Sequence, residues 1–303
     1  MLQPKDDLRH PLRPGPHSRE SLFYNALLPD QEMMIFIYTW VDAANNGGHL
    51  VTVVGDNNVR HAISATDGVP VGDRDFHDWE VQGLRLRHSE PLERAEIGFT
   101  GDDMTLEATF TGIHPAFDYA QNRDGCPRII ADNRFEQSGR ITGTLTLNGR
   151  TIEFSTTGHR DHSWGTRDWD SIQDWKWVSA QAGADLSLNV MQMHWRGETT
   201  QHGYVYRDGK VHPVTDIRTR AHYDNNWWQT ALEMTLRDDG GHDTVVTANR
   251  YALLRFEAGE KLALHEAGCH ARINGQPGVA HFECGWDKAY AAAQAERVAS
   301  GAD

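Results

Sequence analysis

The sequence predicts an almost entirely β protein of up-and-down antiparallel strands, and two observations support this fold class. First, Asn-Gly and Asp-Gly pairs separate segments of strand length at 148–149 and 208–209. These pairs suit tight hairpins because both central residues take a positive φ. Second, apolar and polar side chains alternate between the turns, as they do over 104–110. Such alternation is typical of a half-buried antiparallel strand, and many such strands favour a closed barrel or a sandwich.

The expected elements follow in chain order. The opening stretch, 1–19, is rich in proline and charge, which indicates an extended arm. Strands are expected between the turn signals, at 21–28, 32–41, 104–110, 141–147, 150–157, 203–206, 210–214, 230–236 and 244–250. Only 287–300 combines strong helix formers with no turn residue, which predicts a short C-terminal helix.

The length of 303 residues suits two domains of about 150 residues each. Halves of that size bury enough surface to fold without disulfides or metals. We place the boundary near 151–157, with one barrel over 1–153 and a second over 154–303. The oligomeric state is left open.

The composition disfavours several classes of partner. The net charge of −14 argues against a nucleic-acid partner, which needs a basic surface, and against binding to anionic lipid. The three cysteines, Cys126, Cys269 and Cys284, are widely spaced and form no C-x-x-C motif, which fits a reducing compartment.

Localisation follows from the same kind of evidence. The N-terminus does not look like a signal peptide. The longest apolar run, 33–41, is shorter than the roughly 20 residues that span a membrane. We therefore expect a cytoplasmic protein with no stable membrane insertion.

Residues 158–195 form the segment richest in both aromatic and titratable side chains, with five tryptophans among its histidines and aspartates. On a strand through 158–165, His159, Asp161 and Ser163 would share one face. Arg160, His162 and Trp164 would share the other. His159 and His162 could then not hold one metal ion, and no other metal-ligand, nucleophile-elbow or dinucleotide motif is present. We expect no metal and no cofactor.

What remains is acid–base chemistry in an aromatic pocket. A carboxyl group buried among tryptophans has a raised pKa and can deliver a proton near neutral pH. Histidine can relay that proton, and indole faces stabilise a developing cation. The candidate catalytic residues are Asp161, His162 and His159. The candidate substrate-binding residues are Trp164, Trp175, Trp177, Arg160 and Tyr204.

The candidate residues also have structural interpretations. Arg160 and Asp161 could form a buried ion pair with each other. His159 could be a hydrogen-bonded core residue, and Trp175 and Trp177 could be core packing. The pair Arg85 and Arg87, with His88, fits a solvated face better than an anion site.

The segment Gly158-His159-Arg160-Asp161-His162-Ser163-Trp164-Gly165 resembles the Asp-His-x-Trp-Gly signature of the hydroxyneurosporene synthase (carotenoid hydratase) and AttH-like superfamily. Lipocalin-type Diels–Alderases and tocopherol cyclases resemble the same group. Segments 20–24, 135–140 and 265–268 resemble an uncharacterised bacterial branch.

The resemblance implies two tandem lipocalin-like antiparallel β-barrels with a ligand cavity and no cofactor. It points to Asp161, His162 and Trp164. Carotenoid hydratases carry a downstream Tyr-x-Asp where this chain has Asn189-Val190-Met191, so the acid would be Asp161 or another residue. We expect a cofactor-independent hydratase, cyclase or isomerase acting on a hydrophobic isoprenoid, steroid or polyketide-like substrate. The alternative is a non-enzymatic carrier of a hydrophobic small molecule.

Overall fold

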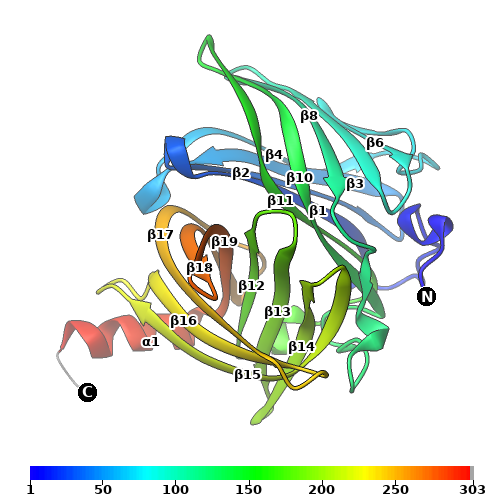
Figure 1. The fold of residues 1–303 in the computed structure, drawn as a ribbon. Coiled ribbons are helices and arrows are strands. Elements are labelled where there is room, and N and C mark those ends of the chain that lie inside the picture. The colour runs from blue at the N-terminus through cyan, green and yellow to red at the C-terminus, as the bar shows by residue number, and fades with distance from the viewer. Residues whose placement is uncertain (301–303) are drawn as a thin grey trace. The chain divides into compact units, whose positions relative to one another are not determined.

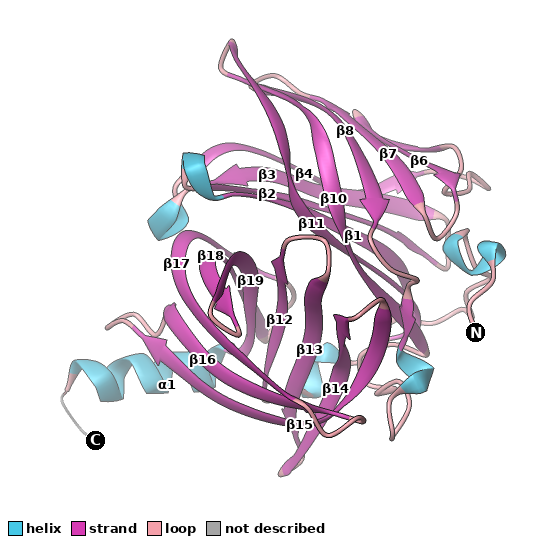
Figure 2. Cartoon of the chain, in the orientation of Figure 1, coloured by secondary structure: helices cyan, strands magenta, loops and turns pink. Residues whose placement is uncertain are grey.

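The predicted all-β fold with a short C-terminal helix is confirmed by the computed structural model, which describes residues 1–300 (Figures 1 and 2). Within those residues the strands form an 11-stranded antiparallel sheet and a closed barrel of β12 to β19. Single turns of 3-10 helix lie at η1 Pro4–Asp7, η2 Pro29–Gln31, η3 Asp56–Asn58, η4 Tyr119–Gln121 and η5 Trp169–Ser171.

The first sheet has the strand order β4-β3-β2-β1-β11-β10-β8-β7-β6-β5, with β9 paired to β10. Its strands are β1 Ser18–Leu28, β2 Met33–Asp42, β3 Asn46–Val54, β4 Arg60–Pro70, β5 Trp79–Val81, β6 Leu84–Glu90, β7 Arg94–Thr100, β8 Met104–Gly112, β9 Phe117–Asp118, β10 Asn133–Leu147 and β11 Arg150–Thr166.

The strand β11 is the one that positions the candidate site. It leaves β10 through the predicted Asn148-Gly149 hairpin, in which both residues have positive φ, 49° and 79°. It then pairs with β10 from Arg150 to Trp164. From Arg160 onward it also pairs with β1, up to Thr166 opposite Ser18. The second half of β11 therefore has a neighbouring strand on each edge, and both of its faces are buried.

The chain divides into two compact units, and the division lies between Arg167 and Asp168. This differs from the division predicted at 153/154. The reason is that β11 is hydrogen-bonded to β1 and β10, so residues 154–167 belong to the first unit instead of opening the second. Short segments at 29–33 and 55–59 belong to the second unit. The last three residues of the predicted second domain, 301–303, lie outside the described part of the chain.

The second unit contains the closed barrel, whose strands are β12 Asp174–Ala182, β13 Leu186–Trp195, β14 Glu198–Arg207, β15 Lys210–Tyr223, β16 Gln229–Asp238, β17 Asp243–Glu257, β18 Leu262–Ile273 and β19 Gln276–Asp287. Closure comes from β12, which pairs with both β13 and β19. Small and branched apolar side chains, such as Val178, Leu188 and Ala267, form its core. The helix α1 Lys288–Ala299 follows, capped by Asp287, which accepts a hydrogen bond from the Tyr290 backbone N–H.

No helix within residues 1–300 is long and apolar enough to cross a membrane.

Protonation of a buried histidine should weaken the second unit in acid. His265 is 2% exposed, and its Nε2 accepts a hydrogen bond from Arg255 Nε at 3.3 Å. Burial, assisted by the charge of Arg255, lowers the pKa of His265 to about 4. The unfolded chain, with a histidine pKa near 6.5, binds the extra proton first, so stability present above pH ~6.5 is lost as the pH falls toward 4.

We expect His265→Gln to reduce the loss of unfolding free energy between pH 7 and 4 by about 3 kcal/mol, measured by urea denaturation. The control is His222→Gln, because the His222 side chain is 41% exposed. Equal pH profiles for His265→Gln and the wild type would contradict the prediction.

Candidate functional site

The polar side chains of β11 are buried on both faces of the strand, in the alternation that the sequence predicts. His159, Asp161 and Ser163 contact partners on one face, whereas Arg160 and His162 contact a different set on the other. A buried charge is costly unless it is paired, so each face needs its own set of compensating groups.

On the Asp161 face, the guanidinium of Arg134 from β10 lies between two carboxylates. Its Nη2 donates to Asp161 Oδ2 at 3.0 Å and its Nε donates to Glu136 Oε1 at 2.6 Å. Ser163 Oγ accepts from Arg134 Nη1 at 3.2 Å and donates to Asp161 Oδ1 at 3.3 Å. Both oxygens of Asp161 therefore have a donor.

The same network continues to His159. Its Nε2 lies 2.8 Å from Glu136 Oε2, and its backbone N–H donates to Asn25 Oδ1 at 2.8 Å. Asp161, Arg134, Glu136 and His159 thus form one continuous polar chain. The predicted residues His159 and Asp161 belong to a common cluster, connected through two β10 side chains.

Asp161 is buried but retains some contact with solvent. Its side chain is 11% exposed, whereas that of Glu136 is 0% exposed. Burial raises the pKa of Asp161, and the negative charge of Glu136 raises it further, while Arg134 and Arg167 oppose the shift without cancelling it.

A second guanidinium lies against this face. Arg167 Nη2 donates to Ser21 Oγ at 2.8 Å and to the Ser163 carbonyl at 2.9 Å. Its Nη1 donates to Tyr38 OH at 3.3 Å. Burial alone would raise the pKa of Tyr38, but the positive charges of Arg167 and Arg19 lower it overall. Tyr38 therefore holds its proton less tightly than usual, whereas Asp161 holds its proton more tightly.

Sequence reasoning missed Arg134, Glu136, Arg167 and Tyr38. Glu136 had a signal, because it lies in the segment 135–140 that contributed to the family resemblance. Arg167 had one too, because Arg167-Asp168-Trp169 follows the signature segment in the resemblance. Arg134 and Tyr38 had none that a single sequence could provide, since their partners lie on separate strands.

On the opposite face, Arg160 is 1% exposed and pairs with Asp7 of the N-terminal arm. Its Nη1 lies 3.0 Å from each Asp7 carboxylate oxygen, and its Nε donates to Gln137 Oε1 at 2.8 Å. The guanidinium also lies over the rings of Phe110 and Phe135. Arg160 and Asp161 therefore do not form the ion pair that the structural interpretation offered as an alternative, and each residue has a partner on its own face.

His162, a candidate catalytic residue next to Asp161 in the sequence, points away from Asp161. Its Nε2 lies 2.7 Å from Glu20 Oε1, which is also 2.7 Å from His10 Nδ1. The ring of Trp164 stacks on His10, with centroids 3.9 Å apart. His162 therefore does not contact Asp161, as the predicted alternation requires, because neighbours on a strand project to opposite faces.

Three predicted residues belong to the second unit. Trp175 and Trp177 are each 2% exposed on β12, and Tyr204 on β14 is 0% exposed. Trp175 Nε1 donates to Glu283, and Trp177 packs edge-on against His281 with centroids 5.4 Å apart. All three are buried side chains of the second unit, whereas the Asp161 cluster belongs to the first unit.

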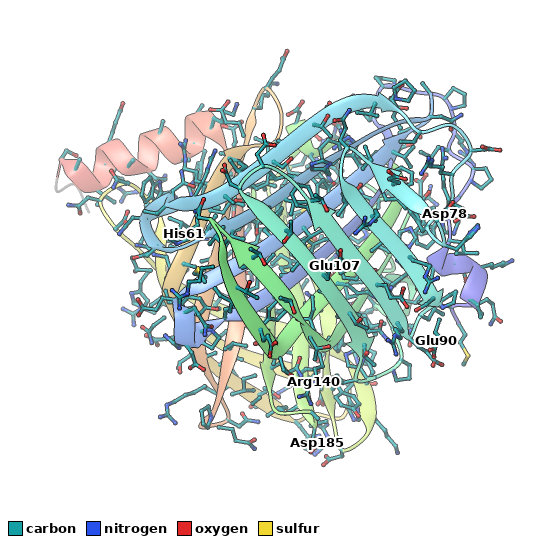
Figure 3. The ribbon with its side chains drawn as sticks, turned by 90° about the horizontal axis from the view of Figure 1, so that it is seen from above. His61, Asp78, Glu90, Glu107, Arg140 and Asp185 are labelled. Carbon is teal, nitrogen blue, oxygen red and sulfur yellow. The ribbon has the colours of Figure 1, made fainter. Side chains whose placement is uncertain are left out.

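A groove of about 540 Å³ lies elsewhere on the first sheet, lined by β5, β6, β7, β8 and β10. Its floor carries exposed ion pairs, Arg85 with Glu107 at 2.7 Å and Arg87 with Glu96 at 2.6 Å. Glu107 lies over the middle of this face in Figure 3. Because acidic and basic groups already neutralise one another there, the groove fits a solvated surface, as predicted for Arg85 and Arg87.

Comparisons with known proteins give a family and a fold. A family model described as "Domain of unknown function (DUF7064)" matches residues 3–288. No curated protein matches the sequence. The structure of a "putative AttH (NE1406)" from Nitrosomonas europaea has a TM-score of 0.65 and 14% identity, covering 88% of this chain and 92% of that one.

A second solved structure, CghA with Sch210972, has a TM-score of 0.60 and 14% identity, covering 88% of each chain. At such identities the similarity establishes the fold alone. It supports the predicted likeness to AttH-like proteins, while the carotenoid hydratase signature stays a prediction.

The Arg160–Asp7 pair should contribute strongly to stability. We expect Asp7→Asn to lower the unfolding free energy by about 3–5 kcal/mol, since it leaves a buried guanidinium without a counter-charge. The measurement is urea denaturation at neutral pH. The control is Asp6→Asn, because Asp6 caps the same turn through an exposed hydrogen bond, and it should cost about 1 kcal/mol or less. A similar loss in the two variants would argue against the pair.

Proposed function

The chain belongs to the DUF7064 family, and we propose that it is an enzyme that moves protons on a hydrophobic small molecule by acid–base chemistry. Asp161 is the reacting group in this proposal. The reaction is a hydration, cyclisation or isomerisation of an isoprenoid, steroid or polyketide-like substrate, and it requires no cofactor.

The observation that carries the proposal is the contrast between Asp161 and the other buried carboxylates on β11 and its neighbours. Asp7, Glu20 and Glu136 have side chains that are 0% exposed, so no substrate reaches them directly. The Asp161 side chain is 11% exposed, with one oxygen bonded to Arg134 and the other to Ser163. It combines burial and the nearby charge of Glu136, which together favour a protonated carboxyl group, with partial exposure to a ligand.

The surrounding groups suit both halves of a proton transfer. When Asp161 gives its proton to an electron-rich carbon, Arg134 Nη2 at 3.0 Å stabilises the carboxylate that remains. The cation formed on the substrate then loses a proton or takes up water, and the proton returns to Asp161. Glu136 holds Arg134 in place by accepting from its Nε at 2.6 Å, and His159 in turn holds Glu136 through a contact of 2.8 Å.

The fold also suits a small-molecule ligand. CghA, a protein of the same fold, has been solved with Sch210972. Fold likeness leaves the chemistry open, so the proposal depends on the residues around Asp161.

We expect turnover in deuterated water to label the substrate. The purified protein would be incubated with a panel of isoprenoids, steroids and polyketides and the products analysed by mass spectrometry. Deuterium incorporation, or the gain of a water, should occur with the wild type. It should fall at least about 100-fold in Asp161→Asn, in line with the loss of a general acid.

The control is Asp174→Asn, which changes a buried aspartate bonded to His194 in the second unit and leaves the Asp161 cluster intact. It should retain wild-type labelling. A compound that binds but is returned unlabelled would identify the protein as a carrier. Full activity in Asp161→Asn would remove Asp161 from the reaction.

A further inference from the structure

We propose that His10, Glu20 and His162 form a binding site for a divalent transition-metal ion, with zinc as the best match. The proposal does not rest on the proposed function, because His162 faces away from Asp161 on β11.

The three residues come from separate parts of the first unit: the N-terminal arm, β1 and β11. Their ligand atoms lie within 4.8 Å of one another. His10 Nδ1 and His162 Nε2 each lie 2.7 Å from Glu20 Oε1. A small shift of the side chains would admit an ion between atoms that already converge on one point.

The chemistry of the set matches zinc. Two imidazole nitrogens and one carboxylate are a ligand set of zinc sites that keep a fourth position open for water. Glu20 and His162 have side chains that are 0% exposed, whereas the His10 side chain is 18% exposed. The partly exposed His10 gives an ion and its water a route to the two buried ligands.

The groups around these three side chains fix their orientation, as the residues around the ligands of a metal site do. His162 Nδ1 has no hydrogen-bond partner among the described residues, and Asp7 Oδ1 lies 3.7 Å away. Metal-bound histidines commonly direct their second nitrogen at a carboxylate, and Asp7 is placed for that contact. The rings of Phe76 and Phe135 pack edge-on against His162, and Trp164 stacks on His10, so both imidazoles are fixed in orientation.

An ion bound there would connect the arm to the sheet. His10 lies outside every strand of the chain, and its backbone N–H already donates to Glu20 Oε2 at 2.8 Å. A metal bond to His10 would add a stronger link at this point. The alternative is a metal-free network in which both histidines donate to Glu20.

Zinc titration of chelator-treated protein distinguishes these two states. We expect one Zn²⁺ per chain by calorimetry and a rise in Tm on adding Zn²⁺ alone. Co²⁺ should give the visible absorption of a four- or five-coordinate site. His10→Ala should weaken Zn²⁺ binding more than 10-fold and abolish the Tm rise. Glu20→Gln should have the same effect.

The control is His194→Ala, since His194 contacts a single carboxylate, Asp174, at 2.8 Å and its side chain is 35% exposed. It should bind Zn²⁺ as the wild type does. If Glu20→Gln fails to fold, His10→Ala decides the question, because His10 is partly exposed and lies on the arm, outside the strands. No Zn²⁺ binding by the wild type, or wild-type affinity in His10→Ala, would overturn the proposal.

Discussion

The structure of the first unit depends on one constraint, which is that β11 carries charged side chains on both faces while it is paired along both edges. A strand in that position cannot turn its charges to water, so each must find a partner in the protein. Arg134 and Glu136 on β10 provide partners on one face, and Asp7 and Glu20 provide them on the other. The arm, β1, β10 and β11 are therefore held in register by electrostatics as well as by the sheet.

Local sequence patterns predicted the parts of this fold that depend on neighbouring residues. The Asn148-Gly149 pair specified the hairpin between β10 and β11 because both residues adopt positive φ. Alternation placed His159 with Asp161 and separated them from His162, because side chains on a strand change face at each residue. The C-terminal helix followed from the helix formers over 287–300, and Asp287 provides its cap.

The partners of the charged residues were not predictable in this way. Arg160 pairs with Asp7, 153 positions earlier in the chain, and His162 contacts Glu20 across 142 positions. No spacing rule connects such residues, since the contact exists only once β1 and β11 are adjacent. The boundary between the units lies later in the chain than the sequence predicts for the same reason. The aromatic-rich segment looks like the start of a domain, but its hydrogen bonds are to β1 and β10.

The two faces of β11 differ in solvent exposure, and this difference separates a structural role from a chemical one. Arg160 and its partner Asp7 are sealed from solvent, and a sealed network can stabilise a fold but cannot meet a substrate. Asp161 has the same kind of partner but retains an accessible edge. The hydrogen bond from Arg134 holds the carboxyl group in one orientation, and a proton donor needs that orientation before it meets a ligand. The exposure of Asp161, more than its charge or its place in a motif, therefore makes this face the better candidate for chemistry.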